Sequence, residues 1–127
     1  MINYLLKYKS ILKKYILLCK LKNINIIFNI NTSCEYQKSF DNFLKELNNH
    51  HYNYCNLLIN NLLHIYVYKN NTICISAKNQ LTNLFKLKLE NKKIKYDLID
   101  GELNITINQS NIENIINIMF LSILEYK

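Results

Sequence analysis

At 127 residues, half of them hydrophobic and 20% charged, the chain can form the core of one domain and is too apolar to be disordered. Its net charge of +7 comes from lysine alone, since arginine is absent, and favours nucleic acid or an anionic membrane as a partner. No apolar run approaches the roughly 18 residues that cross a bilayer, so we expect a soluble or peripheral protein.

The first predicted element is a basic amphipathic helix over residues 2–21. Its apolar side chains recur every three or four residues and form one stripe: Leu5, Tyr8, Leu12, Tyr15, Ile16 and Cys19. Its charges are all positive: Lys7, Lys9, Lys13, Lys14, Lys20 and Lys22. A mitochondrial transit peptide would be rich in arginine and serine, and this helix is not. A membrane-surface helix and a basic arm facing RNA both fit, and we prefer the arm.

A strand and a second helix are predicted next. Residues 24–30 alternate apolar residues with asparagine, which indicates a strand. Thr32 stands three residues before Glu35, a capping-box spacing that predicts a helix over residues 32–47. Its apolar face is formed by Tyr36, Phe40, Phe43, Leu44 and Leu47. Residues 48–61 have no clear period, and residues 57–63 fit either a helix or the approach to a strand.

The centre of the chain, residues 63–107, alternates apolar with polar residues and predicts strands that have one buried and one wet face. Such runs occupy residues 63–68, 72–76, 85–89, 94–98 and 103–107. The expected wet face of the third and fourth runs is basic: Lys86, Lys88, Lys92, Lys93 and Lys95, against one glutamate. This basic ribbon is a suitable surface for a polyanion. Asp100-Gly101 between two runs predicts a tight hairpin.

The last predicted elements are a helix and an edge strand. Ser110 and Glu113 have capping-box spacing before a helix whose core face is Ile112, Ile115, Ile116 and Met119. Residues 121–126 are expected to complete the sheet as a strand. The order is then β-α-β-β-α-β, the ferredoxin-like split βαβ arrangement of the α+β class. We divide the chain into a basic helical extension, residues 1–22, and a ferredoxin-like RNA-packed domain, residues 23–127.

No motif in the sequence indicates catalysis. The single glycine excludes a glycine-rich phosphate loop, and no serine or cysteine lies in a nucleophile motif. Metal-ligand spacing is missing among Cys19, Cys34, Cys55, Cys74, His50, His51 and His64. We therefore expect free buried thiols, no metal, no cofactor, no small-molecule substrate and no enzymatic activity.

Two lysine-rich blocks, residues 7–22 and 86–95, contain eleven of the sixteen positive charges. Charge concentrated in this way binds phosphates by releasing counterions, without reading sequence. Tyr66, Tyr68 and Tyr96 are candidates for stacking on bases, with burial in the sheet as the commoner alternative. The predicted RNA-binding residues are Lys7, Lys13, Lys14, Lys69, Lys78, Lys86, Lys88, Lys92, Lys93 and Lys95.

Three segments carry a family resemblance. They are Thr72-Ile-Cys-Ile-Ser76, Phe85-Lys-Leu-Lys-Leu-Glu-Asn-Lys-Lys-Ile94 and Asn108-Gln-Ser-Asn-Ile-Glu-Asn-Ile-Ile116. They resemble, in turn, a strand with its closing serine, a basic strand and a helix entry of the ribosomal small-subunit protein S-ten family. The resemblance covers residues 24–126, with Lys92 and Lys93 at the family's basic pair. Ala77 stands where the family has proline, and Asp100-Gly101 resembles an insertion.

The resemblance implies a structural protein of the small-subunit head, with a hairpin among ribosomal RNA and the neighbouring S-three, S-nine and S-fourteen proteins. Lysine, asparagine, isoleucine and tyrosine are abundant and have AT-rich codons, which favours an organelle-encoded, mitochondrial ribosome. The alternative is an accessory, non-catalytic subunit of an organellar membrane complex, with the amino-terminal helix at the bilayer surface.

Overall fold

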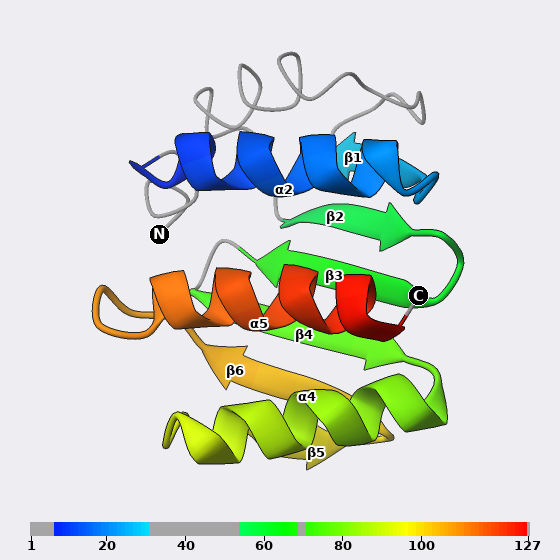
Figure 1. Ribbon diagram of the computed structural model, residues 1–127. Helices are drawn as coiled ribbons and strands as arrows, with labels where there is room; N and C mark the ends of the chain where they lie inside the picture. The colour runs from blue at the N-terminus through cyan, green and yellow to red at the C-terminus, as the bar shows by residue number, and fades with distance from the viewer. Residues whose placement is uncertain (1–6, 31–53, 69–70, 127) are drawn as a thin grey trace.

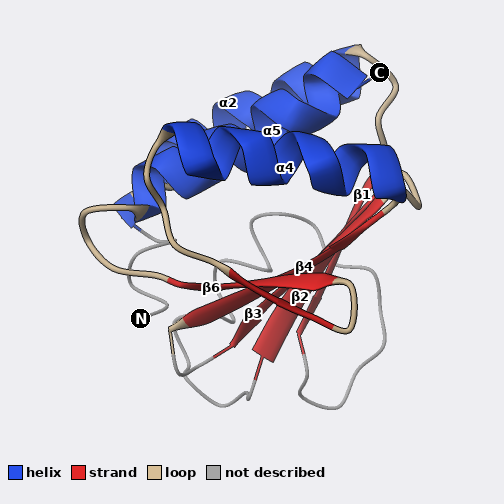
Figure 2. Cartoon of the chain, turned by 90° about the horizontal axis from the view of Figure 1, so that it is seen from below, coloured by secondary structure: helices blue, strands red, loops and turns tan. Residues whose placement is uncertain are grey.

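The computed structural model describes residues 7–30, 54–68 and 71–126. These residues form two layers, in which a sheet is covered on one face by helices (Figures 1 and 2). The elements in chain order are α2 (Lys9–Leu21), β1 (Ile26–Ile30), β2 (Tyr54–Ile59), β3 (Leu63–Tyr68), β4 (Thr72–Ala77), α4 (Asn79–Asn91), β5 (Asp97–Ile99), β6 (Glu102–Thr106) and α5 (Ile112–Tyr126).

The sheet of the described residues has six antiparallel strands in the order β1-β2-β3-β4-β6-β5. Strands β1 to β4 are sequential neighbours. Helix α4 then leads from β4 to β5, and a hairpin returns β6 into the space between them (Figure 1). The unit β4-α4-β5, with β6 between its two strands, is therefore a split βαβ unit.

One face of the sheet supplies the core because side chains alternate along each strand. A row of buried apolar residues crosses four strands through the pairs Leu57–Ile65, Ile65–Ile75 and Ile75–Leu103. Helix α5 lies over this face between α2 and α4 (Figure 1). Phe120 of α5 stacks on Tyr15 of α2, with ring centroids 5.1 Å apart and 4° between the planes.

Helix α2 packs through the apolar stripe that its sequence predicts. Leu12, Tyr15 and Cys19 are buried in the same core cluster as the sheet and α5. The lysines of α2 are on its exposed side. The boundary drawn between residues 22 and 23 falls in the turn that joins this helix to β1.

Asparagine occupies most of the tight turns. Asn23, Asn60, Asn61 and Asn71 have φ between 52° and 70°, a left-handed conformation that asparagine tolerates better than most residues. The Asp100-Gly101 turn joins β5 to β6 with φ of 51° and 80°, so the predicted hairpin is confirmed. The asparagine-rich composition thus supplies the turns that a chain with one glycine requires.

Several predictions are confirmed. The chain is α+β, the amino-terminal helix ends at Leu21, and the strands near residues 24–30, 63–68, 72–76 and 103–107 are present. The segment without a clear period contains β2, whose residues alternate between half-buried and buried. The predicted helix over residues 32–47 lies outside the described residues.

The predicted strand over residues 85–89 is wrong, because these residues belong to α4. Leu81, Phe85 and Leu89 are spaced by four and are all buried, which is a helical period. Leu87 gave the appearance of alternation but is 56% exposed. In place of the next predicted strand, residues 94–98, the structure has only β5, whose three residues are exposed. Residues 85–98 therefore do not form a basic ribbon.

The predicted edge strand over residues 121–126 is also wrong, since α5 continues to Tyr126. Its buried residues Met119, Phe120 and Ile123 extend the helical spacing that begins at Ile112. The ferredoxin-like order is not confirmed, because β1 and β2 are direct neighbours with no strand between them. The capping residue before α5 is Asn108: its Oδ1 accepts hydrogen bonds from the backbone N–H groups of Ser110 and Asn111.

A lysine-lined cleft as a candidate nucleic-acid interface

The predicted RNA-binding lysines that the structure describes lie in and around the helices and not on a strand face. Lys7 precedes α2, and Lys13 and Lys14 are exposed on it. Lys78 is at the amino-terminal cap of α4, whereas Lys86 and Lys88 are half-buried along that helix. Three others follow the carboxyl end of α4: Lys92, Lys93 and Lys95. Lys69 lies outside the described residues.

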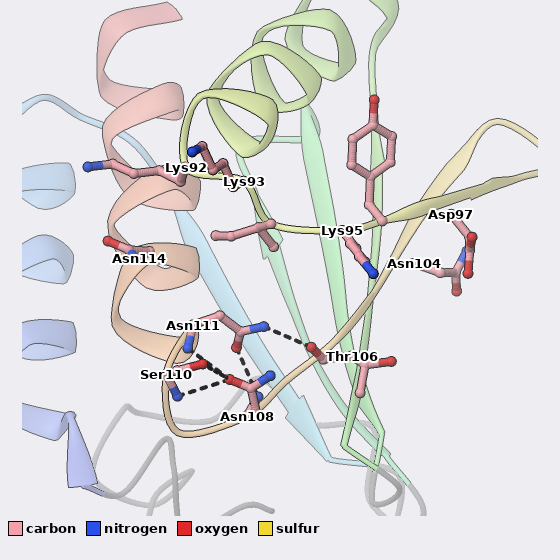
Figure 3. Close-up of a pocket in the computed structure, with 12 residues that line it drawn as sticks. Lys92, Lys93, Lys95, Asp97, Asn104, Thr106, Asn108, Ser110, Asn111 and Asn114 are labelled. Atoms are coloured by element: carbon pink, nitrogen blue, oxygen red, sulfur yellow. Dashed lines mark hydrogen bonds between the residues drawn. The ribbon is translucent and has the colours of Figure 1, made fainter.

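The structure brings Lys92, Lys93 and Lys95 together at a cleft of about 540 Å³. The cleft lies between the segment after α4 and the segment before α5 (Figure 3). Its remaining lining is almost entirely polar: Ile94, Tyr96, Asp97, Asn104, Thr106, Asn108, Ser110, Asn111 and Asn114. Asp97 is the one acidic residue among the described residues of the lining, which together carry a formal charge of +2.

The wall opposite the lysines is fixed by a network of asparagine hydrogen bonds. Asn108 Oδ1 accepts from Ser110 N, Ser110 Oγ and Asn111 N at 2.9, 2.6 and 3.0 Å. Asn111 Oδ1 in turn accepts from Asn108 N at 2.9 Å, and Asn111 Nδ2 donates to the carbonyl of Thr106 at 3.0 Å (Figure 3). These bonds fix the turn before α5, so this side of the cleft is formed in advance of any ligand.

Lys93 is held at the cleft by the end of α4. The N–H of Ile94 bonds to the carbonyl of Leu89 at 2.9 Å, and the N–H of Lys93 to that of Glu90 at 3.0 Å, which is a Schellman motif. The motif requires a left-handed residue, and Lys93 occupies that position with φ 57°. Glycine or asparagine is usual there, and a lysine is strained by about 1–2 kcal/mol.

A second hollow, of about 380 Å³, adjoins the cleft along the helices. It shares Lys92 and Asn114 with the cleft and adds Lys88 of α4 and Tyr15 of α2. Lys88 is paired with Glu125 of α5, with Nζ 3.0 Å from each carboxylate oxygen. Lys92 therefore borders both hollows, whereas the charge of Lys88 is neutralised by Glu125.

Tyr96, in the cleft lining, has an acidic hydrogen-bond partner. The Tyr96 hydroxyl donates to Glu90 Oε1 at 2.9 Å, and this hydrogen bond raises the pKa of Tyr96 above its ordinary value of 10.0. Tyr96 is half-buried and lines the cleft, so it is the one of the three candidate stacking tyrosines that lies there.

The other two candidate stacking residues, Tyr66 and Tyr68, alternate with buried residues of β3 and therefore lie on the sheet face that no described helix covers (Figure 2). With Tyr54 and His64 they form an open-face aromatic cluster: the ring centroids of Tyr66 lie 4.3 Å from His64, 5.6 Å from Tyr54 and 6.2 Å from Tyr68. Their rings are already packed on one another, so they do not join the lysine cleft.

Cys74 lies beside this cluster, with Sγ 3.6 Å from Glu102 Oε1. Burial, and then the carboxylate of Glu102, raise the pKa of Cys74 to about 11. Burial raises the pKa of Cys55, in the core, to about 12. The expected free buried thiols are confirmed for Cys19, Cys55 and Cys74, while Cys34 lies outside the described residues.

No cluster of metal-ligating side chains occurs among the described residues, which include His64 but not His50 or His51. Within the same residues, no helix has the length and apolarity needed to cross a membrane. The polar wall of the cleft is not among the sites predicted from the sequence. The sequence does contain a sign of this wall. Asn108 and Asn111 both stand just before the apolar helix α5, where asparagine is a strong capping residue.

Comparison of the chain with protein-family models, with curated proteins and with solved structures gives no match.

Proposed function

We propose that this protein binds RNA through its lysine-lined cleft and acts without catalysis. The observation that carries the proposal is the convergence of Lys92, Lys93 and Lys95 on a polar cleft, whose described lining contains a single acidic residue. The amide and hydroxyl groups of the opposite wall can donate hydrogen bonds to phosphate and sugar oxygens. Lys92, which also lines the second hollow, extends this surface toward α4.

The particle that we propose is the small subunit of a mitochondrial ribosome, with ribosomal RNA and neighbouring head proteins as partners. The family resemblance and the AT-rich codon bias support this assignment. The strand equivalence of residues 85–94 is not part of the support, because these residues are helical or follow a helix. Of the ferredoxin-like order, the proposal keeps the split unit β4-α4-β5 alone.

RNA binding is tested by removing three charges from the cleft with the variant Lys92→Gln, Lys93→Asn, Lys95→Gln. Asparagine is used at position 93 because it tolerates the left-handed backbone. We expect the affinity for single-stranded RNA to fall at least about tenfold at ~0.1 M salt. The plot of the logarithm of the association constant against the logarithm of the salt concentration should become less steep by about 2, since each of the three phosphate contacts contributes roughly 0.7.

The matched control removes three other exposed lysines, in the variant Lys9→Gln, Lys20→Gln, Lys22→Gln, which lowers the net charge equally. We expect it to retain most of the affinity. Equal losses in the two variants would show that binding depends on net charge alone and would refute the cleft as the site.

The ribosomal assignment is tested by sedimentation of organelle lysate. We expect the protein to sediment with small subunits, to cross-link to their RNA through the cleft, and to be released by high salt. Intact small subunits that sediment without this protein would contradict the assignment, whatever its affinity for free RNA.

A further inference from the structure

The outer side of α2 exposes leucine where a solvated helix would have polar residues. Leu17, Leu18 and Leu21 are 59%, 37% and 73% exposed. They lie within the last two turns and on the side away from Leu12 and Cys19, which are in the core. The apolar stripe predicted from the sequence is therefore used by the fold, and these leucines form a second apolar surface.

The charged residues of α2 and its described flanks are all positive. Residues 7–25 contain no acidic residue, and the helix with its flanks contains Lys7, Lys9, Lys13, Lys14, Lys20 and Lys22. All six are exposed. A convex surface that combines exposed leucine with lysine has the composition of a helix that lies in a membrane interface.

RNA, a second copy of the chain and an anionic bilayer differ in how well they fit this leucine and lysine surface. RNA would contact the lysines but leave the leucines in water or against phosphates, where they contribute nothing. A second copy of the chain would place twelve lysines opposite one another, which is repulsive. An anionic bilayer satisfies both features, because acyl chains receive the leucines and lipid phosphates attract the lysines.

We propose that the outer face of α2, formed by Leu17, Leu18 and Leu21 with the surrounding lysines, docks peripherally on an anionic lipid surface. This face is separate from the RNA cleft. The cleft lies where α4 ends and α5 begins, whereas the leucines are near the end of α2, which is on the same side as the end of α5 (Figure 1). The two surfaces therefore lie toward opposite ends of the helical layer.

The test is co-sedimentation of the whole protein with vesicles of phosphatidylcholine alone and of phosphatidylcholine mixed with phosphatidylglycerol. We expect binding to the mixed vesicles and little to the neutral ones. The variant Leu17→Ser, Leu18→Ser, Leu21→Ser should lose at least about tenfold in partition into mixed vesicles. The variant Lys9→Gln, Lys20→Gln, Lys22→Gln should lose affinity mainly at low salt, where lysine attraction is strongest.

The chain offers a matched control in the exposed apolar residues of other elements. Leu87 of α4 and Leu98 and Ile99 of β5 are 51–56% exposed, and the variant that changes all three to serine should bind vesicles as wild type does. Equal losses in the two triple serine variants would refute the proposal. So would equal binding to neutral and mixed vesicles, or a wild-type dimer in gel filtration that the Leu17, Leu18 and Leu21 substitutions dissociate.

The membrane proposal and the RNA proposal fail separately. Replacement of Lys92, Lys93 and Lys95 should reduce RNA binding and leave vesicle binding unchanged. If it abolishes vesicle binding instead, the lipid contact lies at the cleft and the α2 surface is not the docking site.

Discussion

The two outer surfaces of the molecule differ in chemistry. The helical layer and its flanking loops hold every lysine of the described residues, whereas no described strand contains one. The uncovered sheet face instead holds the open-face aromatic cluster, Cys74 and Glu102. Codon bias alone would place lysine on both surfaces. Lysine is less favourable in strands than in helices, but it is common on edge strands. Its confinement to the helical side of the described residues agrees with our proposal that an anionic partner binds there.

The largest expected difference between the two sides is in stability. Phe120 is 1% exposed and stacks on Tyr15 between α5 and α2, so Phe120→Ala should lower the free energy of unfolding by about 3–5 kcal/mol. Tyr66 is half-buried at the surface of the other face, and Tyr66→Ala should cost about 1 kcal/mol. Denaturant unfolding of both variants measures the two losses in the free energy of unfolding. Similar losses would show that the open face is as tightly packed as the helical side.

The second comparison uses two serines. Ser122 is fully buried in α5 and its hydroxyl has no hydrogen-bond partner among the described residues, whereas Ser76 is half-buried on the open face. Ser122→Ala removes an unsatisfied polar group and improves helix propensity, so we expect a gain of about 1–2 kcal/mol in the free energy of unfolding. Ser76→Ala should change it by less than about 0.5 kcal/mol. A loss of stability in Ser122→Ala would mean that its hydroxyl has a partner in solution.

The sequence predicted the elements whose period was unambiguous. The alternation of residues 63–68 and 72–76 and the Asp100-Gly101 turn led directly to β3, β4 and the last hairpin. Helix α4 was predicted as a strand because Phe85, Leu87 and Leu89 alternate with polar residues by chance. The helical spacing from Leu81 to Phe85 to Leu89 begins before residues 85–89, the segment predicted as a strand.

The candidate cleft could be predicted only in part. Lys92, Lys93 and Lys95 were identified as phosphate contacts from their density along the chain. Their neighbours across the cleft, such as Asn108 and Asn111, are separated from them in the sequence by the β5–β6 hairpin. Nothing local in the sequence records that juxtaposition, which depends on the insertion of β6 between β4 and β5.

The third comparison concerns backbone strain at the cleft and at the hairpin. Lys93 and Asp100 both have positive φ, but lysine tolerates it less well than aspartate. Lys93→Gly should raise the free energy of unfolding by about 1 kcal/mol, and Asp100→Gly by less than about 0.5 kcal/mol. Lys93→Gly should at the same time weaken RNA binding. Unchanged RNA binding in this more stable variant would remove Lys93 from the proposed interface.

The smallest effect expected is the pH dependence contributed by the open face. Burial lowers the pKa of His64 below its ordinary value of 6.5, and the carboxylate of Glu102 opposes this shift. The unfolded chain therefore binds more protons at position 64 than the folded protein does once the pH falls below about 6.5. The stability that neutral His64 contributes to the folded protein is therefore fully present above pH 6.5 and is lost as the pH falls through the pKa of His64 in the folded state.

The stability difference between wild type and His64→Gln, measured by denaturant unfolding from pH 7.5 downward, isolates this residue from the other histidines. We expect wild type to lose stability relative to the variant in acid. Glu102→Gln should strengthen the acid sensitivity, because it removes the charge that favours the imidazolium. A difference that does not change with pH would show that His64 is as hydrated as in the unfolded chain. The aromatic cluster would then be open to solvent, and the contrast between the two faces would rest on charge alone.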